Sequence, residues 1–379
     1  MADNDSLLLE RFEAPGPKRI LALDGGGIRG ALSLGYLERI EKILRKRYNK
    51  PNLVLSDYFD LIGGTSTGAI IAAALAIGKS AAEVKEKYMK LGADIFGDRK
   101  GFLGIYLNCR YDEAPLKTAL KDMFGDIKIG DEGKDALKTG ICIVTKRLDT
   151  FSTWPVCNHP KAKYFNKNRF LLRDFVRAST AAPSFFIPEL VDVGEGEIGS
   201  FVDGGLSLMN NPSLQLFLMA TLQGFPFHWK TGKDDMFIVS VGTGRRNIKL
   251  IAKEYKNPSL LTTAKMAPEQ FMNDANEVVE LMMQYFSNSP TARKIDSEVG
   301  DLNGDILNGK EAFTYNRYNI TLDKNSLIAV GVNTLSNEVI TGLTEMDDAD
   351  NRFILADIGI KAAEDQVKET HFPAIFDIN

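Results

Sequence analysis

Histidine is scarce in this sequence, with only His159, His228 and His371 among 379 residues. A metal site built on imidazole rings would need nearly all of them, and a catalytic serine activated by histidine would have to use one. None of the three lies in a sequence context that suggests a catalytic base, so we expect structural or surface roles for all of them. A catalytic base, if the chain has one, is therefore expected to be another residue type.

Cysteine is rarer than a disulfide framework requires. Cys109, Cys142 and Cys157 are odd in number and form no C-x-x-C pair, which argues against structural disulfides and against a cysteine zinc site. The longest apolar runs, such as residues 69–77, are too short to span a bilayer. The acidic N-terminus also lacks the basic and apolar regions of a secretory signal. We therefore expect a cytoplasmic protein.

Excess positive charge is also lacking. The chain has 46 Lys and Arg residues against 50 Asp and Glu residues, and this balance does not indicate a broad surface for a nucleic-acid polymer. Hydrophobic residues make up 44% of the chain and charged residues 25%, which is typical of a globular protein. The length suits one large domain or two ordinary ones.

The most informative stretch is a short apolar run, a glycine-rich turn and a helix-forming segment over residues 58–77. The turn at residues 64–68 reads GTSTG and matches the G-x-S-x-G pattern of a nucleophile elbow. In such an elbow the serine is lifted off the strand end, and Gly64 and Gly68 let the following helix pass close by. The pattern predicts Ser66 as the nucleophile of an acyl hydrolase; the alternative is a tight connection without chemistry.

A second glycine-rich turn, DGGGIRG at residues 24–30, follows a predicted strand. It matches the G-x-G-x-x-G pattern of dinucleotide sites. That function also needs an acidic residue at the tip of the second strand, where this chain has the Ser66 turn. For acyl transfer, backbone amides in such a loop can approach the substrate closely and stabilise an oxyanion. The glycines of this candidate oxyanion loop are Gly25, Gly26 and Gly27.

Two charged residues complete the candidate chemistry. Arg29 is expected to brace the glycine loop, since a bulky cation beside the site would crowd the carbonyl oxygen. Asp203 follows a predicted strand and precedes Gly204, and a carboxylate within reach of the serine oxygen can accept its proton. The usual pKa of aspartate is low, so a dry pocket or a strong hydrogen bond would have to help. The alternative for Asp203 is a turn cap, which Asp-Gly-Gly forms readily.

Predicted strands and helices alternate through the first two thirds of the chain. Strands are expected at residues 18–23, 58–62, 139–145, 199–203 and 236–241, and helices at residues 34–48, 69–77, 81–91, 114–124, 171–179 and 213–224. This alternation predicts a three-layer α/β/α sandwich with a mostly parallel central sheet. The glycine-rich exits of four of these strands fit the carboxyl edge of such a sheet, where ligand sites gather.

The pattern of predicted strands and helices changes after about residue 246. We expect three parts: an N-terminal arm over residues 1–17, a catalytic domain over 18–245, and a mixed, mainly helical extension packed on it over 246–379. Within the extension we expect a long amphipathic helix at 273–287, a strand at 315–322 and a final helix at 352–368. The methionines on the apolar face of the long helix indicate that this helix packs in the core. The alternative is that the helix forms a lid over the site.

The ordered motifs together resemble the patatin-like phospholipases. They are DGGGIRG at 24–30, GTSTG at 64–68 and DGG at 203–205, with further similarity at 178–183 and 210–212. The resemblance covers roughly residues 18–245. It implies the patatin-like fold and a Ser66–Asp203 dyad that needs no histidine, metal or cofactor. It carries Gly25, Gly26 and Gly27 over as the oxyanion loop. From the motifs themselves we expect supporting roles for Arg29, Gly64, Gly68 and Gly204.

The activity that this resemblance implies is lipid acyl hydrolysis of the phospholipase A or lysophospholipase type, through an acyl-enzyme intermediate. The substrate would be a membrane phospholipid or another acyl-ester lipid, which the enzyme meets by transient peripheral contact with the membrane. An acyl chain needs an apolar groove beside Ser66. Its candidate walls are Phe185, Phe186, Ile187 and the stretch 102–111, all of which are equally compatible with ordinary core.

The main alternative is a phospholipase effector of a bacterial antiviral defence system, which degrades membrane phospholipids when a cyclic nucleotide activates it. Residues 246–379 would then carry a surface for sensing a small-molecule activator or for forming a homo-oligomer. No residue pattern marks a nucleotide pocket. A dinucleotide-binding protein and an inactive interaction module are the weaker alternatives.

Overall fold

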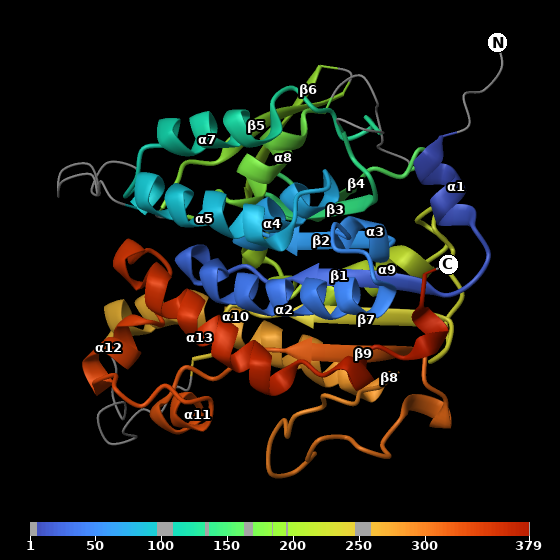
Figure 1. Ribbon diagram of the computed structural model, residues 1–379. Coiled ribbons are helices and arrows are strands. Elements are labelled where there is room, and N and C mark those ends of the chain that lie inside the picture. Colours follow the sequence, from blue (N-terminus) through green and yellow to red (C-terminus); the bar gives the residue numbers. More distant parts are fainter. Residues whose placement is uncertain are drawn as a thin grey trace.

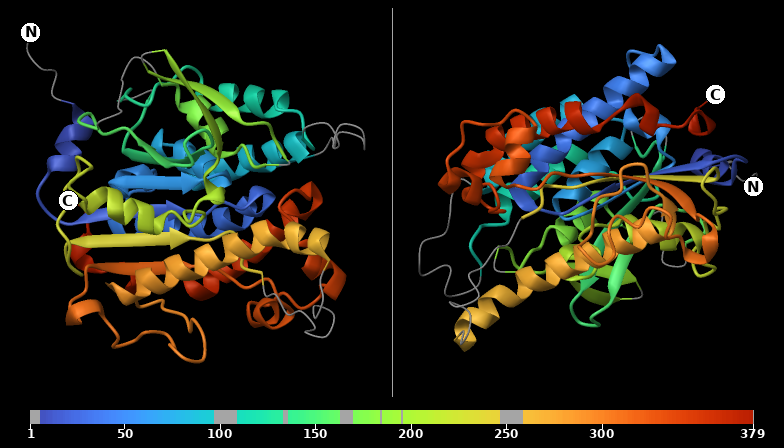
Figure 2. Two further views of the ribbon diagram at one scale, coloured as in Figure 1. Left: turned by 180° about the vertical axis from the view of Figure 1, so that it is seen from behind. Right: turned by 90° about the horizontal axis from the view of Figure 1, so that it is seen from below.

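The computed structural model describes residues 6–96, 109–132, 136–162, 170–183, 185–194, 196–246 and 259–378. Its centre is one mixed sheet in the order β5-β6-β3-β2-β1-β7-β9-β8, with β4 paired to β3. Helices cover both faces of this sheet, with α2 and α13 on one side and α9 and α10 on the other (Figures 1 and 2). The predicted three-layer α/β/α sandwich is confirmed.

The strands divide into a parallel majority and an antiparallel edge. The parallel strands are β1 (Lys18–Leu23), β2 (Leu61–Thr65), β3 (Gly140–Arg147), β7 (Met236–Val241), β8 (Ser287–Asn288) and β9 (Phe313–Tyr318). The antiparallel strands are β4 (Thr153–Cys157), β5 (Glu189–Gly194) and β6 (Glu197–Asp203). Every residue of β7 is buried, as expected for an interior parallel strand that has helices on both faces.

Twelve α-helices lie in the described part of the chain. They are α1 (Leu7–Glu13), α2 (Gly30–Tyr48), α3 (Leu55–Tyr58), α4 (Thr67–Ala76), α5 (Ala81–Phe96), α7 (Ala114–Phe124), α8 (Leu172–Ser179), α9 (Ser213–Thr221), α10 (Leu260–Tyr285), α11 (Lys324–Ala329), α12 (Asn337–Gly342) and α13 (Arg352–Gln366). None of the helices in the described ranges is both long and apolar enough to cross a bilayer.

Helix α10 begins well before the expected residue 273. The added segment contains Thr262, Thr263 and Pro268, which are poor helix formers and mask the helical pattern in the sequence. Methionines on α10 face different surroundings: Met283 is fully buried, while Met272 lines a cavity described below. The helix therefore contributes both to the core and to a cavity wall.

The part of the chain after residue 246 completes the central sheet. Strand β9 lies beside β7 in parallel register, with Val239 opposite Asn316, and β8 continues the sheet on the other side of β9. Helix α13 packs along α2 so closely that a Cβ atom on Gly359 would overlap the carbonyl group of Leu32. One buried apolar cluster extends across residue 246. The division into three parts stays a prediction, but the last part shares its core with the others.

Candidate active site

Ser66 lies at a sharp turn between β2 and α4. Its backbone has φ 55° and ψ −123°, a conformation that non-glycine residues rarely adopt and that stores on the order of 1–3 kcal/mol of strain. The turn is held from both sides. The Ser66 N–H donates to Ser179 Oγ at 2.8 Å, and the Ser66 carbonyl accepts from the Ala69 N–H at 2.9 Å. The surrounding structure therefore holds the strained turn in place.

Three glycines that the sequence analysis singled out, Gly64, Gly68 and Gly204, allow close backbone contacts around the Ser66 turn. A Cβ atom on Gly64 would overlap the carbonyl of Gly68, and one on Gly68 would overlap the carbonyl of Leu23. Helix α4 can therefore start directly against β1 and β2. Gly204 has the same restriction on the other side of the site, where an added Cβ would overlap the carbonyl of Val144.

Ser179, at the end of α8, supports the turn from below. Its hydroxyl accepts the hydrogen bond from the Ser66 N–H and donates one to the Val144 carbonyl at 2.7 Å. The hydroxyl thus ties the Ser66 turn to β3. We did not expect a site role for Ser179 from its chemistry, although it lies within the 178–183 stretch that carries part of the resemblance.

Replacing Ser179 with alanine is expected to lower the free energy of unfolding by about 2 kcal/mol. The change leaves the Ser66 N–H and the Val144 carbonyl without their buried partner, and each unsatisfied group costs about 1–3 kcal/mol before relaxation. Urea unfolding measures the loss. Ser56→Ala is the matched control, because the Ser56 hydroxyl is also buried and has no hydrogen-bond partner among the described residues. Equal losses in the two variants would contradict the expectation.

Asp203 reaches the same site from the antiparallel side of the sheet. Thr65 pairs with Val144 on β3, and the next β3 residue, Thr145, pairs with Asp203 at the end of β6. Asp203 ends β6 beside the carboxyl end of β2, at the edge where it was expected. The strand itself runs antiparallel to β3 and pairs with the part of β3 that extends beyond β2. Residue spacing carries no information on strand direction, so the sequence could not reveal this.

The Asp203 carboxylate is nearly fully buried, and one of its oxygens accepts a hydrogen bond from the Gly205 N–H at 2.7 Å. Burial raises the pKa of Asp203 to about 6, against the opposing effect of hydrogen bonds from the Ser66 side chain and the Gly205 backbone. A carboxylate with this pKa is a better proton acceptor than an exposed aspartate and is still ionised at neutral pH.

The glycine loop lies on the opposite side of Ser66 and its amides differ from one another. The Gly25 N–H donates to the Asn210 carbonyl at 3.1 Å, so it is committed to holding the loop. Within the described residues, the amides of Gly26 and Gly27 have no acceptor. The candidate oxyanion set of three glycines therefore narrows to these two, because Gly25 has no free donor.

Arg29 braces this loop from behind. Its side chain is buried and donates to the carbonyls of Gly26 and Gly244, both at 3.4 Å. The bond to the Gly26 carbonyl turns that oxygen toward Arg29. Gly27 has φ 57°, and a Cβ atom there would overlap the Met346 carbonyl, so the loop can only be built with glycine at this position.

A cavity of about 680 Å³ brings these groups together. Ser66, Asp203, Gly26 and Gly27 line it. Its apolar walls include Ile70, Leu91, Ile95, Leu116, Phe185 and Phe186. Ile187, which we named as a third wall residue, does not belong to this set and is 40% exposed. Most of the other expected wall, residues 102–108, lies outside the described residues.

None of the three histidines, all of which are described, lines this cavity. His159 is buried and stacks on Phe12 with ring centroids 5.1 Å apart. His228 is exposed, and His371 hydrogen-bonds to the hydroxyl of Tyr318 at 3.1 Å. The candidate site therefore contains a serine and a carboxylate without an imidazole.

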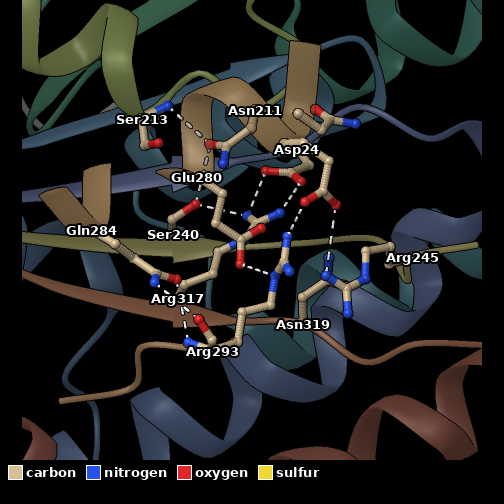
Figure 3. A network of polar contacts seen from close by, with 12 residues as sticks. Asp24, Asn211, Ser213, Ser240, Arg245, Glu280, Gln284, Arg293, Arg317 and Asn319 are labelled. Carbon is tan, nitrogen blue, oxygen red and sulfur yellow. Dashed lines mark hydrogen bonds and ion pairs between the residues drawn. The ribbon is translucent and has the colours of Figure 1, made fainter. Parts of the chain in front are cut away.

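Asp24 connects the glycine loop to a buried polar network that the sequence did not reveal. Both Asp24 oxygens accept from the Arg317 guanidinium, at 2.8 and 2.6 Å, and Arg317 also donates to Ser240 Oγ at 2.7 Å (Figure 3). Burial alone would lower the pKa of Arg317, but the Asp24 carboxylate keeps it above its usual range. Arg317 lies on β9, 293 residues away in the sequence, so no local motif could have indicated this contact.

Several known proteins are similar to this chain in sequence. Among the similar curated proteins, one from Escherichia coli (strain TW11681) named cGAMP-activated phospholipase is 30% identical, over 64% of this chain and 65% of its own. A protein of the same name from Vibrio cholerae serotype O1 is 33% identical, over 59% and 64%. Patatin-17 of Solanum cardiophyllum is 28% identical, over 59% and 60%. This chain therefore spans just under two thirds of the length of these relatives.

A family model described as patatin-like phospholipase matches residues 21–217, more than half of the chain. The matched segment contains the glycine loop, the Ser66 turn and Asp203, the three parts that the fold brings to one cavity. The chain belongs to the patatin-like phospholipase family.

Proposed function

We propose that this protein is a lipid acyl hydrolase that cleaves the fatty acyl esters of glycerophospholipids. The observation that carries the proposal is that Ser66 and the buried carboxylate of Asp203 line one cavity together with Gly26 and Gly27, whose amides have no acceptor among the described residues. A nucleophile, a buried base and oxyanion donors are the parts that ester hydrolysis requires.

In the proposed mechanism, Asp203 accepts the proton of the Ser66 hydroxyl as its oxygen attacks the ester carbonyl carbon. The Gly26 and Gly27 amides donate to the oxyanion that forms. Asp203 then passes the proton to the leaving alcohol, and the acyl group stays on Ser66. A water molecule attacks this acyl-enzyme with Asp203 again acting as base, which releases the fatty acid and restores Ser66.

The cavity favours an acyl chain as the bound group. Its volume of about 680 Å³ lies in the range of ligand pockets, and its lining is mainly apolar. Exposed apolar side chains occur at and near the lining in the sequence: Leu206, which lines the cavity, is 48% exposed, and Leu208, two residues further on, is 60% exposed. Phe271, next to the lining residue Met272, is 73% exposed. These side chains support transient peripheral contact between a cytoplasmic enzyme and a membrane surface.

The direct test is product analysis with phosphatidylcholine vesicles. We expect the wild type to release free fatty acid and a lysophospholipid, both identified by mass spectrometry, and Ser66→Ala to release neither. Release of phosphocholine or phosphatidic acid instead would contradict acyl-ester cleavage. The assay is run with and without cGAMP, and absence of fatty acid in both cases would also contradict the proposal.

A second candidate function is an effector of bacterial antiviral defence, in which a cyclic nucleotide activates this same hydrolase. Two relatives are named for activation by cGAMP. The specific observation in its favour is a second, arginine-lined cavity built largely by the residues after 246. In this candidate function, residues 246–379 sense the activator and support a homo-oligomer.

Activity on a soluble ester is expected to fall about tenfold per pH unit below pH 6 and to level off above it. Asp203 acts as a base only when ionised, and its pKa is about 6. The measurement is kcat/KM for a short p-nitrophenyl ester between pH 4.5 and 8.5, with far-UV circular dichroism at each pH as the control for folding. A folded enzyme with constant activity down to pH 4.5 would rule out Asp203 as the base.

A further inference from the structure

A second cavity, of about 350 Å³, lies beyond the carboxyl ends of β7, β9 and β8. Three arginines line it, each from a different segment: Arg245 follows β7, Arg293 follows β8, and Arg317 belongs to β9 (Figure 3). Glu280 of α10 is the only carboxylate among its described lining residues. The hydroxyl-bearing residues Thr291 and Thr321 also face it. The lining is therefore rich in hydrogen-bond donors, with three guanidinium groups and one carboxylate.

The three guanidinium groups are unequally neutralised. Arg317 is paired with Asp24, and Arg293 donates to Glu280 at 2.6 Å and Glu277 at 2.5 Å. Arg245 is held more loosely, with Glu277 at 3.7 Å and the Thr321 hydroxyl at 3.0 Å. Burial, and then repulsion from Arg293, lowers the pKa of Arg245. An additional negative charge in the cavity would relieve this repulsion.

Arg317 has spare donor capacity at the same place. Its Nε is buried and has no hydrogen-bond partner among the described residues, and an oxygen of Glu280 lies 4.0 Å from it. A buried donor left without an acceptor costs free energy, which a bound acceptor would recover. The planar guanidinium group can donate two parallel hydrogen bonds to two oxygens of a tetrahedral phosphate, which no other side chain does as well.

We infer that this cavity binds a phosphate-bearing anion, held by Arg245, Arg293 and Arg317. Its volume suits the phosphate part of a small ligand rather than an acyl chain. A nucleotide and a lipid headgroup share this chemistry, and binding experiments must separate them. The site is distinct from the hydrolytic cavity, whose described lining includes Ser66 and Asp203.

The same residues connect the anion site to the glycine loop. Arg317 lines the anion site and holds both oxygens of Asp24, and Asp24 directly precedes Gly25. Helix α10 forms a second connection, since its Glu280 lines the anion site and its Met272 lines the hydrolytic cavity. A phosphate bound to Arg317 competes with Asp24 for the guanidinium group. This competition weakens the ion pair that fixes Asp24, the residue next to the glycine loop. This regulatory part rests on the proposed function of the loop.

Isothermal titration calorimetry tests the site without relying on hydrolysis. The probes are inorganic pyrophosphate, cGAMP and vesicles with phosphatidic acid, added to protein with the Ser66→Ala change so that lipid is not consumed. We expect saturable binding of at least one probe and a loss of affinity of about tenfold or more in Arg245→Gln, as removal of a charge-assisted hydrogen bond predicts. Preference for cGAMP identifies a nucleotide site, and preference for vesicles a headgroup site.

Arg45→Gln is the matched control for this titration. The Arg45 side chain is 32% exposed and Arg245 is 34% exposed, and each is paired with a glutamate, but Arg45 lies on α2 away from the anion site. We expect binding to Arg45→Gln within twofold of the parent protein. The inference is overturned if no probe binds, or if the two arginine variants lose affinity equally, which would indicate general surface charge.

Hydrogen exchange tests the connection to the glycine loop. The parent protein is the one that carries only the Ser66→Ala change. We expect the probe that binds most tightly to change the amide exchange of residues 24–34 in this parent protein, and to leave it unchanged when Arg245→Gln is added. Unchanged exchange in the parent protein at saturating probe would overturn the regulatory part. Both readouts are independent of ester cleavage, so a failure of the proposed hydrolase would be seen separately, in the vesicle assay.

Discussion

Asp203→Asn is expected to lower kcat on a soluble ester by on the order of a thousandfold, and Ser66→Ala by at least as much. Asparagine fills the same space but cannot accept the proton of the serine hydroxyl. In the proposed mechanism Ser66 and Asp203 act as one unit, so the double variant should be no slower than the Ser66 variant alone. The measurement is kcat and KM with a short p-nitrophenyl ester for the three variants and the wild type.

The melting temperature distinguishes this loss of activity from a failure of the variant to fold. The pKa of Asp203 in the folded protein, about 6, lies above its ordinary value, so the folded state binds the proton more tightly than the unfolded state. The contribution of this group to stability therefore falls as pH rises through that range. At pH 8 we expect Asp203→Asn to melt at or above the temperature of the wild type. Ester hydrolysis that survives in a folded Ser66→Ala variant would contradict the mechanism.

Arg317→Met is expected to lower the free energy of unfolding by about 3–5 kcal/mol, the usual cost of leaving one partner of a buried ion pair behind. Asp24 and Arg317 are both less than 9% exposed, and two hydrogen bonds join the carboxylate to the guanidinium. The Asp24→Asn/Arg317→Met double variant should recover most of the loss, because no buried charge is then unpaired. Urea unfolding of the three variants measures these differences.

Lys46→Met provides the control for this comparison. Lys46 pairs with Glu369 at 2.7 Å, but the two side chains are 75% and 58% exposed, and such surface pairs contribute about 0–1 kcal/mol. We expect its stability to change by no more than that. If Arg317→Met were equally mild, Asp24 would not depend on the ion pair for its place, and the proposed connection to the glycine loop would lose its physical basis.

The sequence predicted best those structural features that depend on a few neighbouring residues. The GTSTG turn, the glycine loop and β1 each follow from short segments, and the structure has β1 at the predicted residues 18–23. The different states of the Gly25 and Gly26 amides could not be predicted. They depend on Asn210, which is far away in the sequence and accepts the hydrogen bond of only one of the two.

Long-range pairing limits the rest of the prediction. A strand near residue 315 was expected, but nothing in its alternating pattern indicates that it would lie beside β7. The pattern also extended to residue 322, whereas β9 ends at Tyr318. There the Asn319 side chain turns to accept hydrogen bonds from the amides of Gly244 and Ile320. Such contacts are formed by the folded chain and leave no local signal.

The position of β9 also affects when the protein can become active during its synthesis. While the ribosome has released only the segment up to residue 245, the outer edge of β7 is unpaired and Asp24 has no arginine to hold it. At ordinary rates of translation, Arg317 follows roughly 4–15 s later. During that interval the nascent chain already carries Ser66 and Asp203, but its glycine loop lacks the ion pair between Asp24 and Arg317. For the proposed hydrolase, this order of synthesis delays the complete site until Arg317 has been made.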